Sequence, residues 1–421
     1  MGRWTLRRGG RAAVAVAAAL GAAGCSGGDE QSTTTTSTIA VTTTTISPRV
    51  ADGTLYIGGF LPRTGPGAAL GGGMSTAVEQ AVEQINIAGG VLGQQVKLKI
   101  VDESAGTGID ELLADGVDAI VGPASSTVAL SQLADAVNPL TGVVTCSPSA
   151  TALALDDFPD NKLFFRTVPS DSFQMVAIER RVEGTGVESV GVGYLDDPYG
   201  RALKDVLEDE IRKANEVTLQ TPVGFEADQE DLAPAAQQLL AGNPGVVVVL
   251  GDADDGTRLL QALDAETSGT GPPVVVVNDA IRDGRQAIQA LSPEFRSRLS
   301  GVAPLATTRV VPGPDGFFTA NATDCVNIIA LAAIQAGSDD PAEIKTNMAS
   351  VSAGGQTCTD FADCAIRLAG GFSIDFSGYS GDVELSATTG DRTRAWFETF
   401  SFNADGEDQP LDAPFEVVLD S

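Results

Sequence analysis

Short apolar runs alternate with longer segments in which apolar residues recur every three or four positions, beginning at Thr54. Apolar runs of this length are typical of strands buried on both faces of a parallel sheet, and the longer period is typical of helices. The sequence therefore predicts a first continuous α/β series. Its strands are expected at 54–60, 95–102, 118–121 and 142–146, and its helices at 72–88, 108–115 and 126–137.

The same alternation restarts after Arg166. Strands are expected at 188–195, 216–224, 245–250 and 272–277, and helices at 171–183, 199–214, 231–241 and 255–265. Two series of the same kind predict an α/β protein with two Rossmann-like lobes, each built on a parallel central sheet. A chain of 421 residues also exceeds what one hydrophobic core usually supports.

The last third of the chain lacks a third series of this kind. A long helix is expected at 317–336 and a shorter one at 341–350, followed by β-like runs at 383–387 and 394–402. We expect this part to return to the first lobe and then to cross to the second, so that several crossovers form a hinge. The predicted lobes are 51–167 with 307–370, and 168–306 with 371–421.

Residues 1–24 have the features of a secretory signal peptide. Four arginines accompany an apolar core that is too short to span a membrane. The ending from Ala22 to Cys25 resembles a bacterial lipobox, in which the chain is cut before a cysteine that becomes lipid-modified; an ordinary signal with an incidental cysteine is the alternative. Residues 25–50 continue as a Thr-rich stretch typical of a disordered linker. We therefore expect an exported protein, lipid-anchored to the outer face of the cytoplasmic membrane.

Charge and composition exclude several classes of function. The chain has 26 basic and 56 acidic residues, a formal net charge of −30, and no histidine. Such a surface repels nucleic acid, and the absence of histidine removes Ser-His-Asp and Cys-His catalysis and His-ligated zinc. No GxxxxGK[ST] loop occurs, and the acidic run at 252–256 lacks the spacing of a calcium loop. We therefore expect no enzyme activity, no cofactor, no metal and no nucleic-acid partner.

Small hydroxyl residues follow two neighbouring predicted strands. Ser126 comes after the strand at 118–121, and Ser149 and Thr151 come after the strand at 142–146. Because the carboxyl ends of parallel strands meet at one edge of a sheet, these hydroxyls are expected at a ligand-binding edge. Ser126 stands at a predicted helix N-cap, where N–H groups and the helix dipole suit a carboxylate, and capping alone is the alternative.

Four cysteines lie within the predicted lobes. Cys358 and Cys364 are close together in a polar exported segment and are expected to form a local disulfide. Cys146 ends a buried strand and Cys325 lies in an apolar helix, so small buried thiols are the favoured interpretation. A disulfide between these two is the alternative.

Several strings, in order and at matching spacing, are similar to a known family. They are IGGFLPRTGPGAALG, INIAGGVLGQQVKLKIVDE, DAIVGPASSTVAL, CSPSATALAL, LFFRTVPSD and YLDDPYGRAL, followed near the end by GGQTCTDFADC and IDFSGYSGDVEL. From Leu55 to about residue 305, and less strongly to Phe402, the chain resembles the solute-binding proteins of branched-chain amino acid ABC transporters, the leucine/isoleucine/valine-binding type. The last two strings resemble a segment of actinobacterial lipoproteins of this type.

The resemblance implies the type I periplasmic-binding fold, a clamshell of two lobes joined by three crossovers. It further implies a monomer that binds an amino acid, or a related small amide or acid, between the lobes. The loaded protein would then be presented to the permease subunits of an ABC importer, with no chemistry of its own. A ligand-sensing receptor domain of the same fold, feeding a signalling partner, is the alternative.

The resemblance also implies roles for individual residues. Ser126 would face the ligand carboxylate through its hydroxyl and N–H. Ser149 would offer its backbone carbonyl to the ligand ammonium. Thr151 would contribute its hydroxyl and N–H to the ligand, and Ala150 lies between these two residues in the same cradle. Tyr199 would close on the ligand from the second lobe; a packed surface residue is its alternative.

Three further positions concern the rest of the ligand. Asp279 would pair with the ammonium, and a loop acid or helix cap is the alternative. Leu70 stands where relatives often place an aromatic side chain against the ligand, so the pocket would be apolar but differently shaped. Asp252 stands where some relatives have another aromatic residue. If it faced the cleft, it would favour a cationic or polar ligand. The favoured interpretation is that it faces solvent and does not contact the ligand.

Overall fold

The computed structural model describes residues 51–65, 67–305 and 316–419. The predicted signal peptide, the lipidated Cys25 and the Thr-rich linker lie outside the described residues. Within those described ranges, no helix is both long and apolar enough to cross a membrane.

The first sheet has five parallel strands in the order β2-β1-β3-β4-β5. The strands are β1 (Tyr56–Leu61), β2 (Lys97–Asp102), β3 (Ala119–Val121), β4 (Val144–Ser147) and β5 (Phe164–Arg166). All residues of the central strands β3 and β4 and of the edge strand β5 are buried, as expected for a parallel sheet with helices on both faces. Gly59 lies opposite Val121, which lies opposite Cys146, so the carboxyl ends of β1, β3 and β4 lie within two residues of one another.

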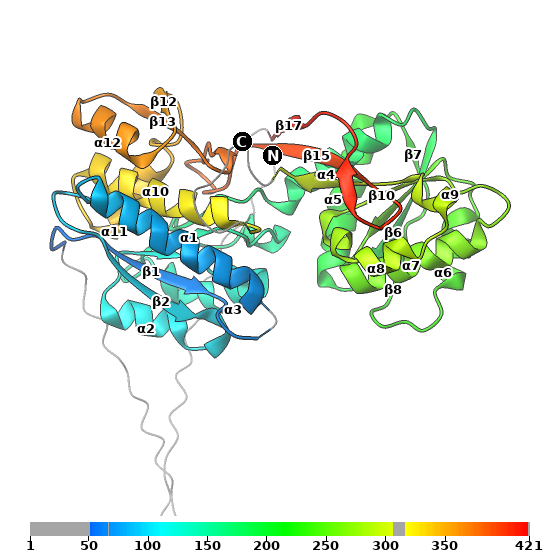
Figure 1. The fold of residues 1–421 in the computed structure, drawn as a ribbon, viewed down its shortest axis with the longest axis horizontal. Coiled ribbons are helices and arrows are strands. Elements are labelled where there is room, and N and C mark those ends of the chain that lie inside the picture. The colour runs from blue at the N-terminus through cyan, green and yellow to red at the C-terminus, as the bar shows by residue number, and fades with distance from the viewer. Residues whose placement is uncertain (1–50, 66, 306–315, 420–421) are drawn as a thin grey trace, which may run out of the picture. The chain divides into compact units, whose positions relative to one another are not determined.

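Helices from both ends of the chain cover this sheet. They are α1 (Ala68–Ile87), α2 (Gly108–Asp115), α3 (Ser126–Ala136), α10 (Thr319–Ala336) and α11 (Pro341–Met348). Figure 1 shows α10 beside α1, and α10 also contacts β3 and β4. Every residue of α10 from Thr319 to Ala333 is buried, and from Ile328 to Ala333 the sequence is apolar on all sides, as expected for a helix enclosed by other elements.

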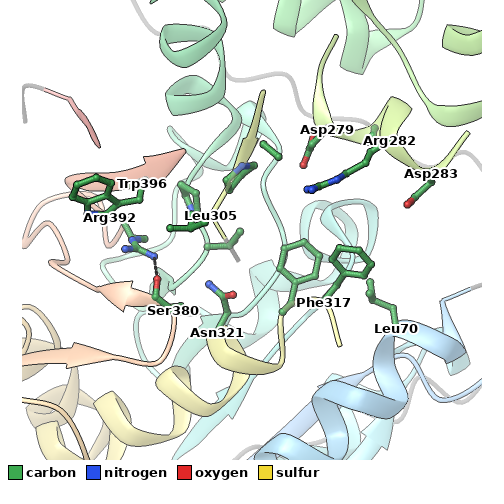
Figure 2. Close-up of a pocket in the computed structure, with 17 residues that line it drawn as sticks. Leu70, Asp279, Arg282, Asp283, Leu305, Phe317, Asn321, Ser380, Arg392 and Trp396 are labelled. Carbon is green, nitrogen blue, oxygen red and sulfur yellow. Dashed lines mark hydrogen bonds between the residues drawn. The ribbon is translucent and has the colours of Figure 1, made fainter. Parts of the chain in front are cut away.

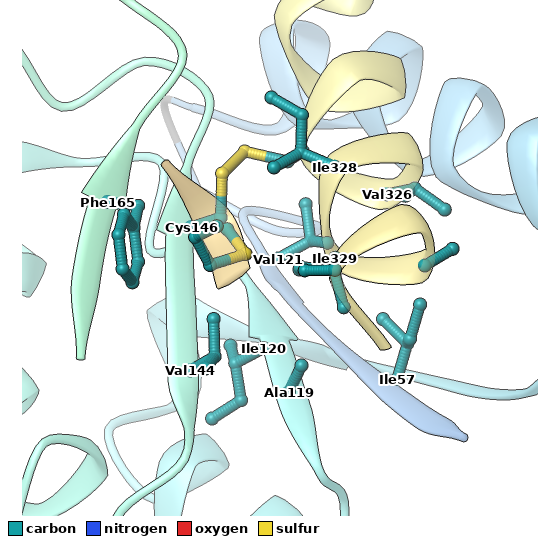
Figure 3. Packing of buried hydrophobic residues seen from close by; sticks show 14 of the residues in the cluster. Ile57, Ala119, Ile120, Val121, Val144, Cys146, Phe165, Val326, Ile328 and Ile329 are labelled. Atoms are coloured by element: carbon teal, nitrogen blue, oxygen red, sulfur yellow. A yellow bond between two sulfur atoms is a disulfide. The ribbon is translucent and has the colours of Figure 1, made fainter. Parts of the chain in front are cut away.

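A disulfide joins this central helix to the sheet. Cys146 on β4 bonds to Cys325 on α10, with their Cα atoms 5.7 Å apart (Figure 3). The favoured prediction of free thiols is therefore wrong, because α10 packs directly across β4 and brings the two side chains within bonding range. The predicted disulfide between Cys358 and Cys364 is confirmed.

The second sheet is larger and mixed. Its order is β16-β15-β11-β10-β9-β6-β7, with β8 paired to β6 and β17 paired to β15. The parallel strands are β6 (Ser189–Leu195), β7 (Thr218–Leu219), β8 (Val223–Phe225), β9 (Val246–Leu250), β10 (Val274–Val277) and β11 (Leu299–Pro304). The antiparallel strands are β15 (Arg394–Phe402), β16 (Asp408–Pro410) and β17 (Phe415–Val418).

The single strand predicted over 216–224 is divided into β7 and β8. Pro222 lies between them and has no N–H to donate to a ladder. The helices of this part are α4 (Asp171–Glu183), α5 (Pro198–Ala214), α6 (Ala233–Leu240), α7 (Ala253–Glu266), α8 (Arg285–Gln289) and α9 (Pro293–Arg296). Apolar cores lie on the two faces of the sheet, so the predicted α/β class with two Rossmann-like units is confirmed.

A small third sheet follows α11. It contains β12 (Gln356–Cys358), β13 (Ile374–Gly378) and β14 (Gly381–Asp382), with α12 (Phe361–Ala369) beside them. Phe376 and Val383 pack in the core of the first sheet, whereas Ala395 and Phe397 pack against the second. The predicted boundary between 370 and 371 is therefore too early, because the small sheet belongs with the first core.

Hydrogen bonds join the segments in which the chain passes between the two large sheets. Thr167 Oγ1 donates to the Asn321 carbonyl at 2.9 Å, and Asn321 Nδ2 donates to the Thr167 carbonyl at 2.8 Å. Arg392 Nη1 donates to the same Thr167 carbonyl at 3.1 Å. Because a buried polar group costs free energy unless it is paired, these bonds stabilise a defined arrangement of the connecting segments.

Candidate functional site

The loops that follow β3 and β4 are hydrogen-bonded to each other. Ser147 Oγ donates to the Pro123 carbonyl at 2.6 Å, and Ser149 Oγ donates to the Ala124 carbonyl at 2.9 Å. Ser126 Oγ accepts from the Ala152 N–H at 3.2 Å. The expected adjacency of the two loops that carry Ser126 and Ser149 is therefore confirmed.

The cap of α3 differs by one residue from the prediction. Ser125, with extended backbone angles, is the N-cap and accepts from the Val128 N–H at 3.4 Å, whereas Ser126 is the first helical residue. The prediction of Ser126 as the cap is wrong, because the helix begins at Ser126, one residue earlier than a cap at 126 requires. Ser126 instead contributes one of the N–H groups that have no partner within the helix, so the anion-binding character of this helix start remains.

A buried carboxylate supports this loop from below. Glu103, in the short 3₁₀ segment Glu103–Ala105, is 3% exposed and accepts from the N–H groups of Ala124 at 2.7 Å and Ser125 at 3.2 Å. Burial raises the pKa of Glu103 to about 7, against the lowering effect of these two bonds. Sequence reasoning missed this residue, and its signal is an acid directly after a strand of the same sheet.

Two acids meet on the opposite side of the Thr151 loop. Asp171, the first residue of α4, is 5% exposed, and its N–H donates to the Thr151 carbonyl at 3.0 Å. Burial raises the pKa of Asp171 to about 7, with a further contribution from the negative charge of Asp279, against the Thr151 hydroxyl and Arg166. Among the described residues, Asp171 Oδ2 is buried without a hydrogen-bond partner.

Asp279 begins the 3₁₀ segment Asp279–Asp283 after β10. Burial raises its pKa, and the side chain of Gln174 and the N–H of Ala280 oppose that effect. The structure therefore brings Asp279 close to Asp171, which sequence reasoning missed as a site residue. Two acids with raised pKa values, one with an unpaired oxygen, form a site that a cation would stabilise.

Tyr199 belongs to the same cluster. It lies in the first turn of α5, where Asp197 Oδ1 caps the helix by accepting from the Gly200 N–H at 2.7 Å. Burial, followed by the charges of Asp171 and Asp279, raises the pKa of the half-buried Tyr199 hydroxyl. Thr151, Asp171, Tyr199 and Asp279 thus form one group, which we call the acid cluster.

The remaining two positions from the sequence lie elsewhere. Asp252 is exposed and caps α7, accepting from the Asp255 N–H at 2.7 Å. Leu70, in the first turn of α1, lines a cavity of about 220 Å³ together with Asp279 (Figure 2). Ser126, Ser149 and the remaining members of the acid cluster do not line this cavity. Asp279 is therefore the residue that belongs to both the acid cluster and the cavity.

The cavity has a largely apolar wall. Its apolar lining comes from α1, from the segments that follow β5 and precede α10, and from β11 and β15 of the second sheet; it includes Leu70, Val168, Pro169, Ala303, Pro304, Leu305, Phe317, Phe318, Ala395 and Trp396. Phe318 holds a left-handed backbone conformation, φ 61°, directly before α10. Bulky residues rarely adopt this conformation, and such strain is concentrated at functional sites.

Comparison with known proteins identifies the family. A family model described as periplasmic binding protein matches residues 54–308, more than half of the chain. The chain belongs to this family. Periplasmic binding proteins are solute-binding proteins and not enzymes, and the membership makes this an extracytoplasmic protein.

Individual relatives of this periplasmic binding protein have low sequence identity to it. A chemotactic signal transduction system substrate-binding protein of Halobacterium salinarum is 27% identical over 366 residues, covering 79% of this chain and 83% of the relative. A Leu/Ile/Val-binding protein homologue of Brucella abortus is 25% identical over 314 residues, covering 70% and 82%. The solved structure of a branched-chain amino acid transporter substrate-binding protein from Streptococcus pneumoniae, in complex with isoleucine, has the same fold, with a TM-score of 0.62, 22% identity, and coverage of 87% of this chain and all of the other.

Proposed function

We propose that this periplasmic binding protein binds a free amino acid through both charged groups of its backbone. The observation that carries the proposal is the position of Thr151, which belongs both to the hydroxyl-rich loop after β4 and, through its contact with Asp171, to the acid cluster. A zwitterion needs clustered N–H and O–H donors for its carboxylate and acids or carbonyls for its ammonium. Both kinds of group are adjacent here.

The carboxylate would lie at the start of α3. Ser126 and Thr151 supply hydroxyl and N–H donors, and the helix dipole adds a partial positive charge. Ser149 and Ala150 continue the same loop, and the Ser149 carbonyl is a further partner for the ammonium. Glu103 holds the loop that carries Ser126 in place from below.

The ammonium would lie between Asp171 and Asp279. Burial makes the ionised form of each acid costly in the ligand-free protein, so a cation that pairs with them recovers that cost. Tyr199 would contact the ligand from α5, and Leu70 would contact its side chain. Asp252 acts as a helix cap in this proposal and is not assigned to the ligand.

The protein would serve as the receptor of an ABC importer, anchored to the membrane through a lipid on Cys25 and delivering its ligand to the permease subunits. The relatives named for branched-chain amino acids support this role. Ligand binding would favour a closed arrangement of the two lobes, because only that arrangement lets the ligand touch both.

A receptor that feeds a signalling partner is the second candidate, supported by the chemotactic relative that covers 79% of the chain. Deletion of the gene, followed by uptake of a labelled ligand and by a migration assay toward it, separates the two. Loss of uptake supports the importer, and loss of migration with normal uptake supports the sensor.

The binding proposal is tested by titration calorimetry and thermal melting with the twenty amino acids and with small amides. We expect heat and a raised Tm with at least one amino acid, and no response to the matching amine or carboxylic acid that lacks one of the two charges. No response to any amino acid would contradict the proposal.

A further inference from the structure

We infer that the preferred ligand is an amino acid with an aromatic side chain, and that the cavity beside Asp279 receives its ring. This inference rests on the proposed function, because it takes the ligand ammonium at the acid cluster as its starting point. It concerns the ligand side chain, which none of the hydroxyl-bearing loops would contact.

Asp279 connects the two sites. It belongs to the acid cluster with Asp171 and also lines the cavity. Figure 2 shows Asp279 on one side of the cavity and Phe317 and Leu70 on the other, with the Arg282 side chain reaching in beside Asp279. A side chain attached one carbon away from an ammonium held at Asp279 would therefore enter this cavity, toward the wall that contains Phe317 and Leu70.

The cavity wall exposes large apolar side chains that a ligand would cover. Phe317 is 60% exposed, Trp396 is 39% exposed and Leu70 is 36% exposed, and all three line the same cavity. Exposed apolar side chains that line one cavity, with a polar group beside them, are typical of a ligand site. Leucine at position 70 occupies less space than an aromatic residue would, which leaves room for a ring supplied by the ligand.

The size of the cavity fits a ring. It measures about 220 Å³, and an apolar cavity of about 150 Å³ is enough to bind benzene. A ring beside Phe317 gains the offset or edge-to-face contact that aromatic pairs prefer. An aliphatic side chain of leucine size would leave part of this apolar wall uncovered.

The charged groups of the cavity do not favour a charged side chain. Arg282 pairs with Glu398 at 2.9 Å and with Asp408, so its charge is already neutralised. Arg392 donates to backbone carbonyls, including those of Thr167 and Ser380. The guanidinium N–H groups of both arginines are therefore engaged within the protein, which disfavours an anionic side chain in the cavity.

A cationic side chain would have Asp283 as its further partner. This acid is exposed, and pairs between exposed charges contribute little in water. The apolar contacts with Phe317 and Leu70 are therefore expected to decide the ranking, so that an aromatic side chain binds more tightly than a basic one.

The test is titration calorimetry with phenylalanine, leucine, lysine and alanine. We expect phenylalanine to bind roughly tenfold or more tightly than leucine, as an aromatic contact added to apolar burial allows. Tighter binding of leucine or lysine would overturn the inference while leaving the amino-acid receptor intact. If none of these four amino acids and no other amino acid bound, both this inference and the proposed amino-acid receptor would be contradicted.

Two matched variants locate the ring. Phe317→Ala should weaken phenylalanine binding about tenfold and leave alanine binding unchanged, whereas Phe372→Ala, at a 53% exposed position outside the cavity, should change neither. Equal losses for phenylalanine and alanine, or no loss, would place the ring elsewhere and overturn the inference. Phe317→Leu keeps an apolar residue at the position and gives the same comparison if the alanine variant does not fold.

Trp396 gives an independent readout. The chain has two tryptophans, Trp4 within the predicted signal peptide and Trp396 in the cavity wall. In the processed protein, phenylalanine should shift the fluorescence of Trp396 to shorter wavelength as the cavity fills. Calorimetry could instead show saturating phenylalanine binding while Trp396 emission stays unchanged, in both the parent and the Phe372→Ala control. That result would contradict the placement of the ring in this cavity.

Discussion

Replacing Asp171 by asparagine should stabilise the ligand-free protein at pH 8 and weaken ligand binding. Asp171 is 5% exposed, its Oδ2 has no hydrogen-bond partner among the described residues, and the charge of Asp279 lies close by. An amide of the same shape removes the buried charge without creating a cavity. It also removes half of the acid pair that would hold the ligand ammonium.

The expected magnitude follows from the pKa of this carboxyl. Raising it from 3.8 to about 7 costs about 4 kcal/mol of folding free energy once the group is ionised. Because the folded pKa is the higher one, the folded protein retains the proton more strongly than the unfolded chain. The contribution of protonated Asp171 to the folding free energy is therefore fully present below about pH 4 and is lost as the pH rises to about 7.

The variant should remove that loss. Asp171→Asn and the parent protein should have similar stability at pH 4, whereas at pH 8 the variant should be more stable by up to about 4 kcal/mol. Bound ligand should raise the Tm of the parent at pH 8 and raise that of the variant far less.

Denaturant unfolding at pH 4 and pH 8, with and without ligand, is the assay. Asp135→Asn is the matched control, because this acid is exposed on α3 and should change neither stability nor affinity. A variant that is less stable than the parent at pH 8, or that binds ligand with parental affinity, would refute the reasoning. The first result would mean that the ionised carboxylate is well solvated, and the second that the ammonium lies elsewhere.

Three other outcomes are expected. The Ser126→Ala, Thr151→Ala double variant should lose roughly a hundredfold or more in affinity by calorimetry, because two donors to a charged carboxylate are removed; parental affinity would undo the assignment of these hydroxyls. Removal of the Cys146–Cys325 disulfide by serine substitution should lower the free energy of unfolding by about 3–5 kcal/mol, as the 179-residue separation implies, and an unchanged denaturation midpoint would contradict this. Glu103→Gln should weaken ligand binding more at pH 8 than at pH 5, because at pH 8 it replaces an ionised acceptor of two N–H groups; an equal loss at both pH values would mean that the charge of Glu103 is irrelevant.

Strong local patterns account for most of the predicted fold. The helices at 108–115 and 171–183 and the strand at 394–402 have the bounds that the sequence predicted. Each has a clear period and a clear start, such as the Ser170 cap before α4. The short loops after β3 and β4 were also predictable as neighbours, because parallel strands bring their carboxyl ends together whatever the details of packing.

The missing parts depend on tertiary placement. Asp171 follows a helix cap, where an acid is ordinarily explained by the helix dipole, and it is one of 56 acidic residues. Its role emerges only when α4 is packed beside the Thr151 loop and Asp279. The Cys146–Cys325 bond likewise depends on α10 lying across β4, and no local spacing encodes a contact between residues so far apart.

Asp279 explains why affinity and selectivity need different residues in this protein. Groups that recognise the amino-acid backbone cannot distinguish one amino acid from another, since every candidate ligand carries the same carboxylate and ammonium. Selectivity must then come from whatever lies one carbon beyond the ammonium, and on that side Asp279 is followed by Phe317 and Leu70. Substitutions at Phe317 should therefore change the ranking of ligands while those at Asp171 lower affinity for all of them, and a variant of Asp171 that reordered the ligands would show that the two functions are not separate.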